Sequence, residues 1–233
     1  MRQSTWIVFA LAVLAGCSFF PVDLKDLSRE PPIRQRYLFD VSLVAAAPSM
    51  VDPESLPEPV VVAVVVPVLL PVVLPVLLIE QARAASPFNG RPFIYRTSAA
   101  EHSADYYHEF LTSPAEQITQ ITSRWLRTTQ QFAHVIESDS ALLANQLLSI
   151  ELIDLRGDYR DVGSPLAVVG LRMVLTQMGG DVHSAAILFE KDYLAEVAMP
   201  EASPSHLVAA WSAGIQLVMT ELSSDLGRLP ERP

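Results

Sequence analysis

A run of twenty apolar residues, 60–79, places the tightest restriction on how this chain can fold, because three prolines interrupt it at a spacing of four. Length alone would allow a transmembrane helix. However, Pro67, Pro71 and Pro75 would each remove a backbone hydrogen bond, and the surrounding valines favour extended structure. We therefore expect an extended or polyproline-like insertion whose last part, residues 76–79, enters a core strand. Two alternatives stay open, namely an apolar surface that meets lipid or a partner, and a membrane-spanning helix.

The only cysteine of the chain, Cys17, directly follows the small residues Ala15 and Gly16. Ahead of them lie one basic residue, Arg2, and an apolar stretch over residues 6–14 that is too short to span a bilayer. This pattern is typical of a lipoprotein signal sequence. We expect residues 1–16 to be removed as a signal peptide and Cys17 to carry a diacylglycerol and an N-acyl chain such as palmitate. Two or more acyl chains hold a protein stably on a membrane.

The rest of the chain divides into a tether, a domain and a tail. Residues 17–33 are largely polar and contain three prolines, which predicts a tether. We expect the domain to cover residues 34–228, with residues 60–79 as an insertion and residues 229–233 as a tail. An Asp after the acylated cysteine commonly signals retention in the inner membrane, and this chain has Ser18 there. We therefore expect an outer-membrane lipoprotein of a Gram-negative bacterium that faces the periplasm, with the inner membrane as the alternative.

Charge and motif content argue against several classes of function. The formal net charge is −10, which disfavours nucleic acid as a partner. The sequence lacks a phosphate-binding loop and the G-x-S-x-G pattern of a hydrolase nucleophile, and its five histidines show no metal-ligand spacing. The one local cluster joins His102 and His108 to Asp105 and Glu109, which we interpret as solvated or hydrogen-bonded groups around an aromatic strand. We expect no enzyme, no cofactor beyond the lipid on Cys17, and no metal site.

Hydrophobic periodicity predicts an α/β fold of the α+β kind, a two-layer sandwich with two main amphipathic helices on a mostly antiparallel sheet. Strands are expected at residues 36–44, 92–96, 104–110, 148–152 and 167–175, with a turn at 179–181 and a returning strand at 183–193. The first helix is expected to begin after Ser113, and the second to cover residues 204–226 and to end at Gly227. Their apolar faces are expected to be Ile118, Ile121, Trp125, Leu126 and Phe132 for the first helix, and Leu207, Ala210, Trp211, Val218 and Leu222 for the second.

Residues 90–98, which read GRPFIYRTS, and the following aromatic residues Tyr106, Tyr107 and Phe110 carry a resemblance to a known family. The chain resembles the ABC-type transport auxiliary lipoproteins, the paraquat-inducible lipoprotein group, over about residues 36–228. The helix around Trp125, the paired strands and the closing helix occur in that family's order. Two features depart from the family: Phe110 stands where it often carries Trp, and the insertion is longer and more apolar.

The resemblance implies a non-enzymatic accessory subunit that works beside an ABC ATPase, a permease and a tunnel protein of the mammalian-cell-entry type. Such a system moves lipids between the inner and outer membranes. A structural envelope lipoprotein that binds other envelope proteins without transport is the alternative, and a homo-oligomer stays open. A partner surface is expected at Tyr95 and Arg96 together with Tyr106 and Tyr107, with core packing as the competing interpretation of the same residues.

Overall fold

The computed structural model describes residues 33–43, 74–138, 140, 142–161, 163–179 and 185–229. Cys17, most of the predicted tether and residues 60–73 of the apolar run lie outside this part of the chain. Residues from Arg34 onward form a unit separate from the first 33 residues, and the description below concerns that unit.

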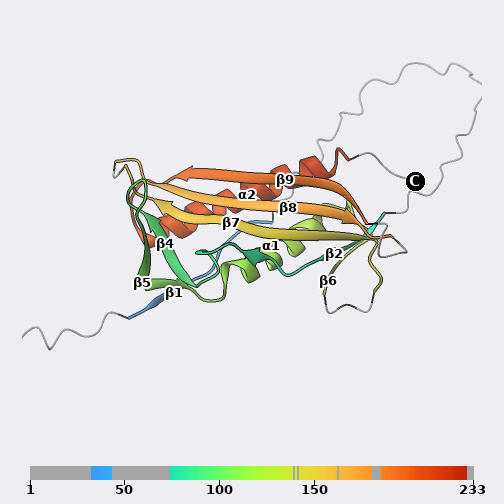
Figure 1. The fold of residues 1–233 in the computed structure, drawn as a ribbon, viewed down its shortest axis with the longest axis horizontal. Coiled ribbons are helices and arrows are strands. Elements are labelled where there is room, and N and C mark those ends of the chain that lie inside the picture. The colour runs from blue at the N-terminus through green and yellow to red at the C-terminus, as the bar shows by residue number, and fades with distance from the viewer. Residues whose placement is uncertain are drawn as a thin grey trace, which may run out of the picture. The chain divides into compact units, whose positions relative to one another are not determined.

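Three long strands dominate the sheet: β7 (Gln146–Asp158), β8 (Leu166–Gln177) and β9 (Ala186–Ala198) pair in order as an antiparallel meander. The other edge of β7 carries three short parallel strands in succession: β2 (Val76–Ile79), β3 (Arg83–Ala84) and β4 (Pro92–Arg96). Beyond β2 lies β6 (His134–Glu137), and beyond β4 lie β5 (His102–Phe110) and then β1 (Gln35–Tyr37). The sheet therefore divides into two arms on this side of β7 (Figure 1).

Both helices lie on the same face of the sheet and give the predicted two layers (Figure 1). Helix α1 (Pro114–Thr128) packs on β3, β6 and β7, and helix α2 (Pro204–Leu226) packs on β8 and β9. The N-terminus of α1 is capped as predicted, because the Ser113 side chain accepts a hydrogen bond from the backbone N–H of Glu116. Ser203 caps α2 in the same way. The α+β sandwich expected from the sequence is therefore confirmed.

The hydrophobic core fills the space between the sheet and the helices. Alternate residues of β7 and β8 point into it, so Leu148, Leu152 and Leu171 are fully buried. Burial of each such side chain contributes about 1.5–3 kcal/mol. At Gly214 of α2, a Cβ atom would lie 3.3 Å from the side chain of Val169, so this glycine lets the helix approach the sheet closely.

The predicted strand at residues 36–44 is wrong for residues 38–43, and residue 44 lies outside the described part of the chain. Residues 38–43 stay extended but leave the sheet and run between the two helices. The backbone N–H of Phe39 donates to the side chain of Gln117 at 2.9 Å, and that of Asp40 donates to Ser212 Oγ at 3.1 Å. These helix side chains replace the neighbouring strand as hydrogen-bond partners.

The predicted apolar face of the first helix is right except for Phe132. Helix α1 ends at Thr128, and the hydroxyl of Thr129 then bonds to the carbonyl oxygen of Leu126 at 2.9 Å. Gln130 takes a left-handed backbone conformation with φ 57°, which turns the chain away. Phe132 therefore packs against the core from the loop after the helix. The five residues predicted for the face of α2 are all buried.

The end of the apolar run enters the core as predicted. Residues 76–79 form β2, where Leu77 and Ile79 are 0% and 1% exposed, so a membrane-spanning helix over residues 60–79 is wrong for that part. No helix in the described ranges is both long and apolar enough to cross a membrane. The hairpin of β8 and β9 is confirmed, although β9 continues to Ala198, five residues beyond the predicted end. Of the turn predicted at residues 179–181, the last two residues lie outside the described ranges.

Candidate functional site

The predicted partner surface falls on the arm made by β4, β5 and β1. Strand β5 pairs with β4 at both ends, but the register shifts between Pro92 and Ile94, so residues 105–108 have no partner in β4. On the opposite edge of β5, β1 pairs with residues 108–110. Residues 105–107 therefore form a bulged stretch that pairs with no strand in the described part of the chain.

The carboxylate of Asp105 holds this bulge together. Its Oδ2 accepts a hydrogen bond from Tyr95 Oη at 2.6 Å and lies 2.7 Å from His108 Nδ1, while its Oδ1 accepts the backbone N–H groups of Tyr107 and His108 at 2.7 and 3.1 Å. Burial alone would raise the pKa of Asp105, but the hydrogen bonds from Tyr95, Tyr107 and His108 outweigh it and lower that pKa below its ordinary value. Asp105 is thus a charged acceptor that links β4 to the bulge.

Tyr95 and Arg96 have structural contacts at the end of β4. The ring of Tyr95 stacks on that of Tyr159 with 5.2 Å between centroids, and burial followed by the bond to Asp105 raises the pKa of Tyr95. Burial and the nearby Asp105 charge raise the pKa of Tyr159 to about 12. Arg96 donates to the carbonyl oxygens of Ser98 and Ala99 at 3.2 and 3.0 Å and so closes the turn after β4.

Tyr106 and Tyr107, by contrast, face solvent, with 69% and 42% of their surface exposed. Neighbouring side chains on a regular strand point to opposite faces. In the bulge the two rings instead meet edge to face, with 5.1 Å between centroids. The guanidinium of Arg34 lies 4.7 Å from the centre of the Tyr106 ring, within the range of a cation–π contact. We call Arg34, Tyr106 and Tyr107 the tyrosine patch.

The other members of the predicted local cluster, His102, His108 and Glu109, have different surroundings. His102 is exposed, whereas Glu109 accepts from both Arg36 and Arg91 at 3.2 and 3.1 Å. Only His108 joins Asp105, which agrees with the hydrogen-bonded interpretation for that pair. Within the described ranges, no group of three or more His, Cys, Asp or Glu side chains is placed to hold a metal ion.

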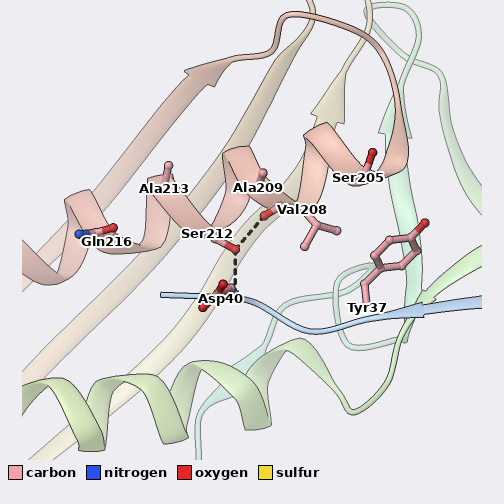
Figure 2. A pocket seen from close by; sticks show the side chains of 8 residues that line it. All are labelled: Tyr37, Asp40, Ser205, Val208, Ala209, Ser212, Ala213 and Gln216. Atoms are coloured by element: carbon pink, nitrogen blue, oxygen red, sulfur yellow. Dashed lines mark hydrogen bonds between the residues drawn. The ribbon is translucent and has the colours of Figure 1, made fainter. Parts of the chain in front are cut away.

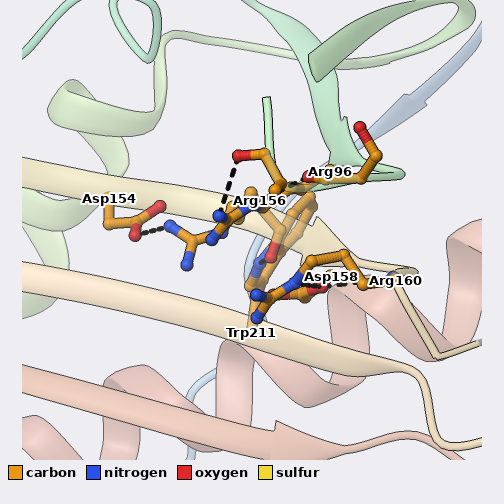
Figure 3. A network of polar contacts seen from close by, with 8 residues as sticks. Arg96, Asp154, Arg156, Asp158, Arg160 and Trp211 are labelled. Carbon is orange, nitrogen blue, oxygen red and sulfur yellow. Dashed lines mark hydrogen bonds and ion pairs between the residues drawn. The ribbon is translucent and has the colours of Figure 1, made fainter. Parts of the chain in front are cut away.

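A charged network that the sequence did not predict lies at the end of β7, close to Arg96 (Figure 3). Arg160 donates to both carboxylate oxygens of Asp158, at 2.8 Å from Nε and 2.7 Å from Nη2, and Arg156 forms an ion pair with Asp154. Hydrogen bonding to Arg160 lowers the pKa of Asp158, and burial together with the charge of Arg96 lowers the pKa of Arg156. The indole Nε1 of Trp211 donates to the carbonyl oxygen of Arg156 at 3.2 Å, which ties the network to α2.

An open groove of about 390 Å³ lies where residues 38–43 run beside α2 (Figure 2). Ser212 joins the two walls, since it accepts from the backbone N–H of Asp40 and donates to the carbonyl oxygen of Val208 at 2.8 Å. The lining residues are Tyr37, Asp40, Ser205, Val208, Ala209, Ser212, Ala213 and Gln216. Asp40 is the one charged side chain among these eight. The groove therefore offers few polar or charged groups that could recognise a ligand.

Neither a protein-family model nor a curated protein matches the sequence. Solved structures do resemble the fold. Protein XCC0632 from Xanthomonas campestris, of family DUF330, aligns with a TM-score of 0.58 and 16% identity over 68% of this chain and 88% of its own. An uncharacterized protein aligns with a TM-score of 0.55 and 13% identity over 67% of this chain and 94% of its own. At these identities the likeness concerns the fold alone, and the chain shares that fold with a DUF330 protein.

Proposed function

We propose that this protein is a membrane-anchored lipoprotein of the bacterial envelope that acts as an accessory subunit of an ABC transporter of the mammalian-cell-entry type. In this role it faces the periplasm from the outer membrane and assists the movement of lipids between the two membranes. The observation that carries the proposal is the sole cysteine, Cys17, behind a short apolar signal sequence. Acyl chains on Cys17 replace a transmembrane helix as the anchor.

The place of the family-like residues in the fold supports the accessory role. Residues 90–98 form β4 and its flanking turns, and Tyr106, Tyr107 and Phe110 all belong to β5. The residues quoted for the resemblance to the transport auxiliary lipoproteins therefore lie on one arm of the sheet. Phe110 lies in the aromatic core under this arm, 4.7 Å from Phe93 between ring centroids, so the arm is firmly attached to the domain.

Co-purification tests the proposal. The acylated protein is extracted in a mild detergent with a C-terminal tag, and the recovered proteins and lipids are identified by mass spectrometry. We expect an ATPase, a permease and a tunnel protein together with bound phospholipid. The Cys17→Ser variant, which we expect to fold without the anchor, serves as the matched control and should recover less of the membrane-embedded subunits.

The competing role predicts a different result. A structural envelope lipoprotein would recover other envelope proteins and no ATPase or permease. Recovery of that set from the acylated protein, with the acyl chains confirmed on Cys17, would contradict the transport role while keeping the anchor.

A further inference from the structure

We propose that the tyrosine patch is a membrane-docking surface that places the domain against lipid headgroups. The inference rests on the proposed acylation of Cys17. It assigns a contact to the folded domain itself, in addition to the lipid anchor.

The chemistry of the patch suits the interface between lipid and water. Tyr106 and Tyr107 each combine an apolar ring with a hydroxyl, and such side chains concentrate at the headgroup level of membranes. With 69% and 42% of their surface exposed, both rings are available without any rearrangement of the core. Arg34 beside Tyr106 adds a cation that can meet a lipid phosphate.

The chain that follows Cys17 enters the folded unit at this surface. Arg34 is the first residue of the folded unit, and Gln35 pairs with His108 directly beside the two tyrosines. Cys17 lies seventeen residues before Arg34, since 34 − 17 = 17, and a chain of that length spans at most about 60 Å. The anchor therefore attaches to the domain at the tyrosine patch. Attachment this short raises the local lipid concentration, so a patch of weak intrinsic affinity is sufficient.

Local charge also favours an anionic membrane at this place, although the whole chain has a net charge of −10. Arg36 and Arg91 both contact the carboxylate of Glu109 and neutralise it. Asp105 turns inward to its tyrosine and histidine partners and is 12% exposed. Arg34 forms no ion pair with any described residue. The surface around the tyrosines is therefore not acidic, unlike the protein as a whole.

The bulge argues against an added protein strand as the occupant. A strand that joins a sheet edge needs free backbone donors there. The N–H of Tyr107 is already bonded to Asp105 Oδ1 at 2.7 Å. The bulge thus blunts the edge against strand addition and presents side chains instead of backbone groups.

Tryptophan quenching tests the contact in the full acylated protein. The Tyr106→Trp variant is reconstituted into vesicles of phosphatidylethanolamine and phosphatidylglycerol that carry brominated acyl chains. The matched control is Ile187→Trp, because Ile187 is also well exposed, at 63%. Ile187 pairs with Thr176 near one end of the β8–β9 hairpin, whereas β4 pairs with β7 near the opposite end of the sheet. The native Trp125 and Trp211 are buried and give a low background. We expect several-fold stronger quenching at position 106 than at position 187.

A second measurement separates the patch from the anchor. In the Cys17→Ser protein, which has no acyl chains, the double variant Tyr106→Ser, Tyr107→Ser should lower vesicle partition about tenfold with an unchanged melting temperature. Equal quenching at positions 106 and 187, or an unchanged partition, would overturn the inference. If the double variant lost a co-purified protein but still bound vesicles fully, the patch would be a protein-binding surface. That result would also overturn the inference. Intact mass of the acylated protein reports the anchor independently, so a failure of the proposed function and a failure of the patch give different results.

Discussion

Replacement of Asp105 by Ala gives a demanding test of how the β4–β5 arm is built. The substitution removes the acceptor for Tyr95 Oη, His108 Nδ1 and two backbone N–H groups. A hydrogen bond to a charged group contributes about 1.5–3 kcal/mol. The four bonds share one carboxylate whose burial costs free energy, so the net loss is well below their sum. We expect the free energy of unfolding to fall by about 2–4 kcal/mol at neutral pH.

The pH dependence of this loss has a definite sign. The folded-state pKa of Asp105 is lowered, so the unfolded chain binds a proton more readily than the folded one as the pH falls. The stabilisation by the charged form is therefore complete above the ordinary pKa of about 4, and it disappears as the pH falls through the folded-state value. The difference between wild type and Asp105→Ala should shrink in acid.

Urea unfolding of the Cys17→Ser protein measures both effects, with fluorescence of the buried Trp125 and Trp211 as the signal. Asp192→Ala is the matched control, since Asp192 makes an ion pair of 2.7 Å with Arg172 on the exposed face of the sheet. We expect the control to unfold close to the wild-type midpoint. A loss below about 0.5 kcal/mol for Asp105→Ala at neutral pH, or a loss that persists undiminished in acid, would refute the role assigned to Asp105.

Three further outcomes are expected. Phe110→Trp should cost about 1–3 kcal/mol of stability in urea unfolding, because Phe110 is 1% exposed and its ring lies 5.1 Å from Phe39; a gain in stability would show that the core accepts a larger aromatic ring at this position. Leu77→Ala should cost about 2–5 kcal/mol, because the side chain is fully buried; a cost below about 1 kcal/mol would exclude β2 from the core. Cys17→Ser should release the protein from membranes after a high-salt wash, as judged by fractionation; a variant that still pellets would require another anchor.

Much of the fold follows from local sequence patterns. The period of two along β8 and the capping residues of both helices depend only on residues that are close together in the sequence. Their positions were therefore predictable. Strands β3 and β6 were not predicted, because two or four residues carry no period. What defines these strands is their partners, since β3 pairs with the middle of β7 and β6 with β2.

The candidate site was predictable in composition but not in arrangement. The aromatic residues of β5 were evident in the sequence. Which of them pack inward and which face solvent depends on the register shift opposite Phe93. Around this shift, Tyr95 bonds to Asp105, whereas Tyr106 and Tyr107 are exposed. The same limit applies to the charged network at the end of β7, because Arg156 and Trp211 meet only after α2 packs on the sheet.

The proposed accessory role is best tested by lipid transfer with the reconstituted transporter. Donor and acceptor vesicles carry the inner-membrane subunits and the acylated protein respectively, and ATP-dependent transfer of a labelled phospholipid is followed. We expect transfer to fall several-fold when the protein is omitted or replaced by Cys17→Ser. Transfer that is unchanged without the protein would contradict the accessory role and favour a structural envelope lipoprotein.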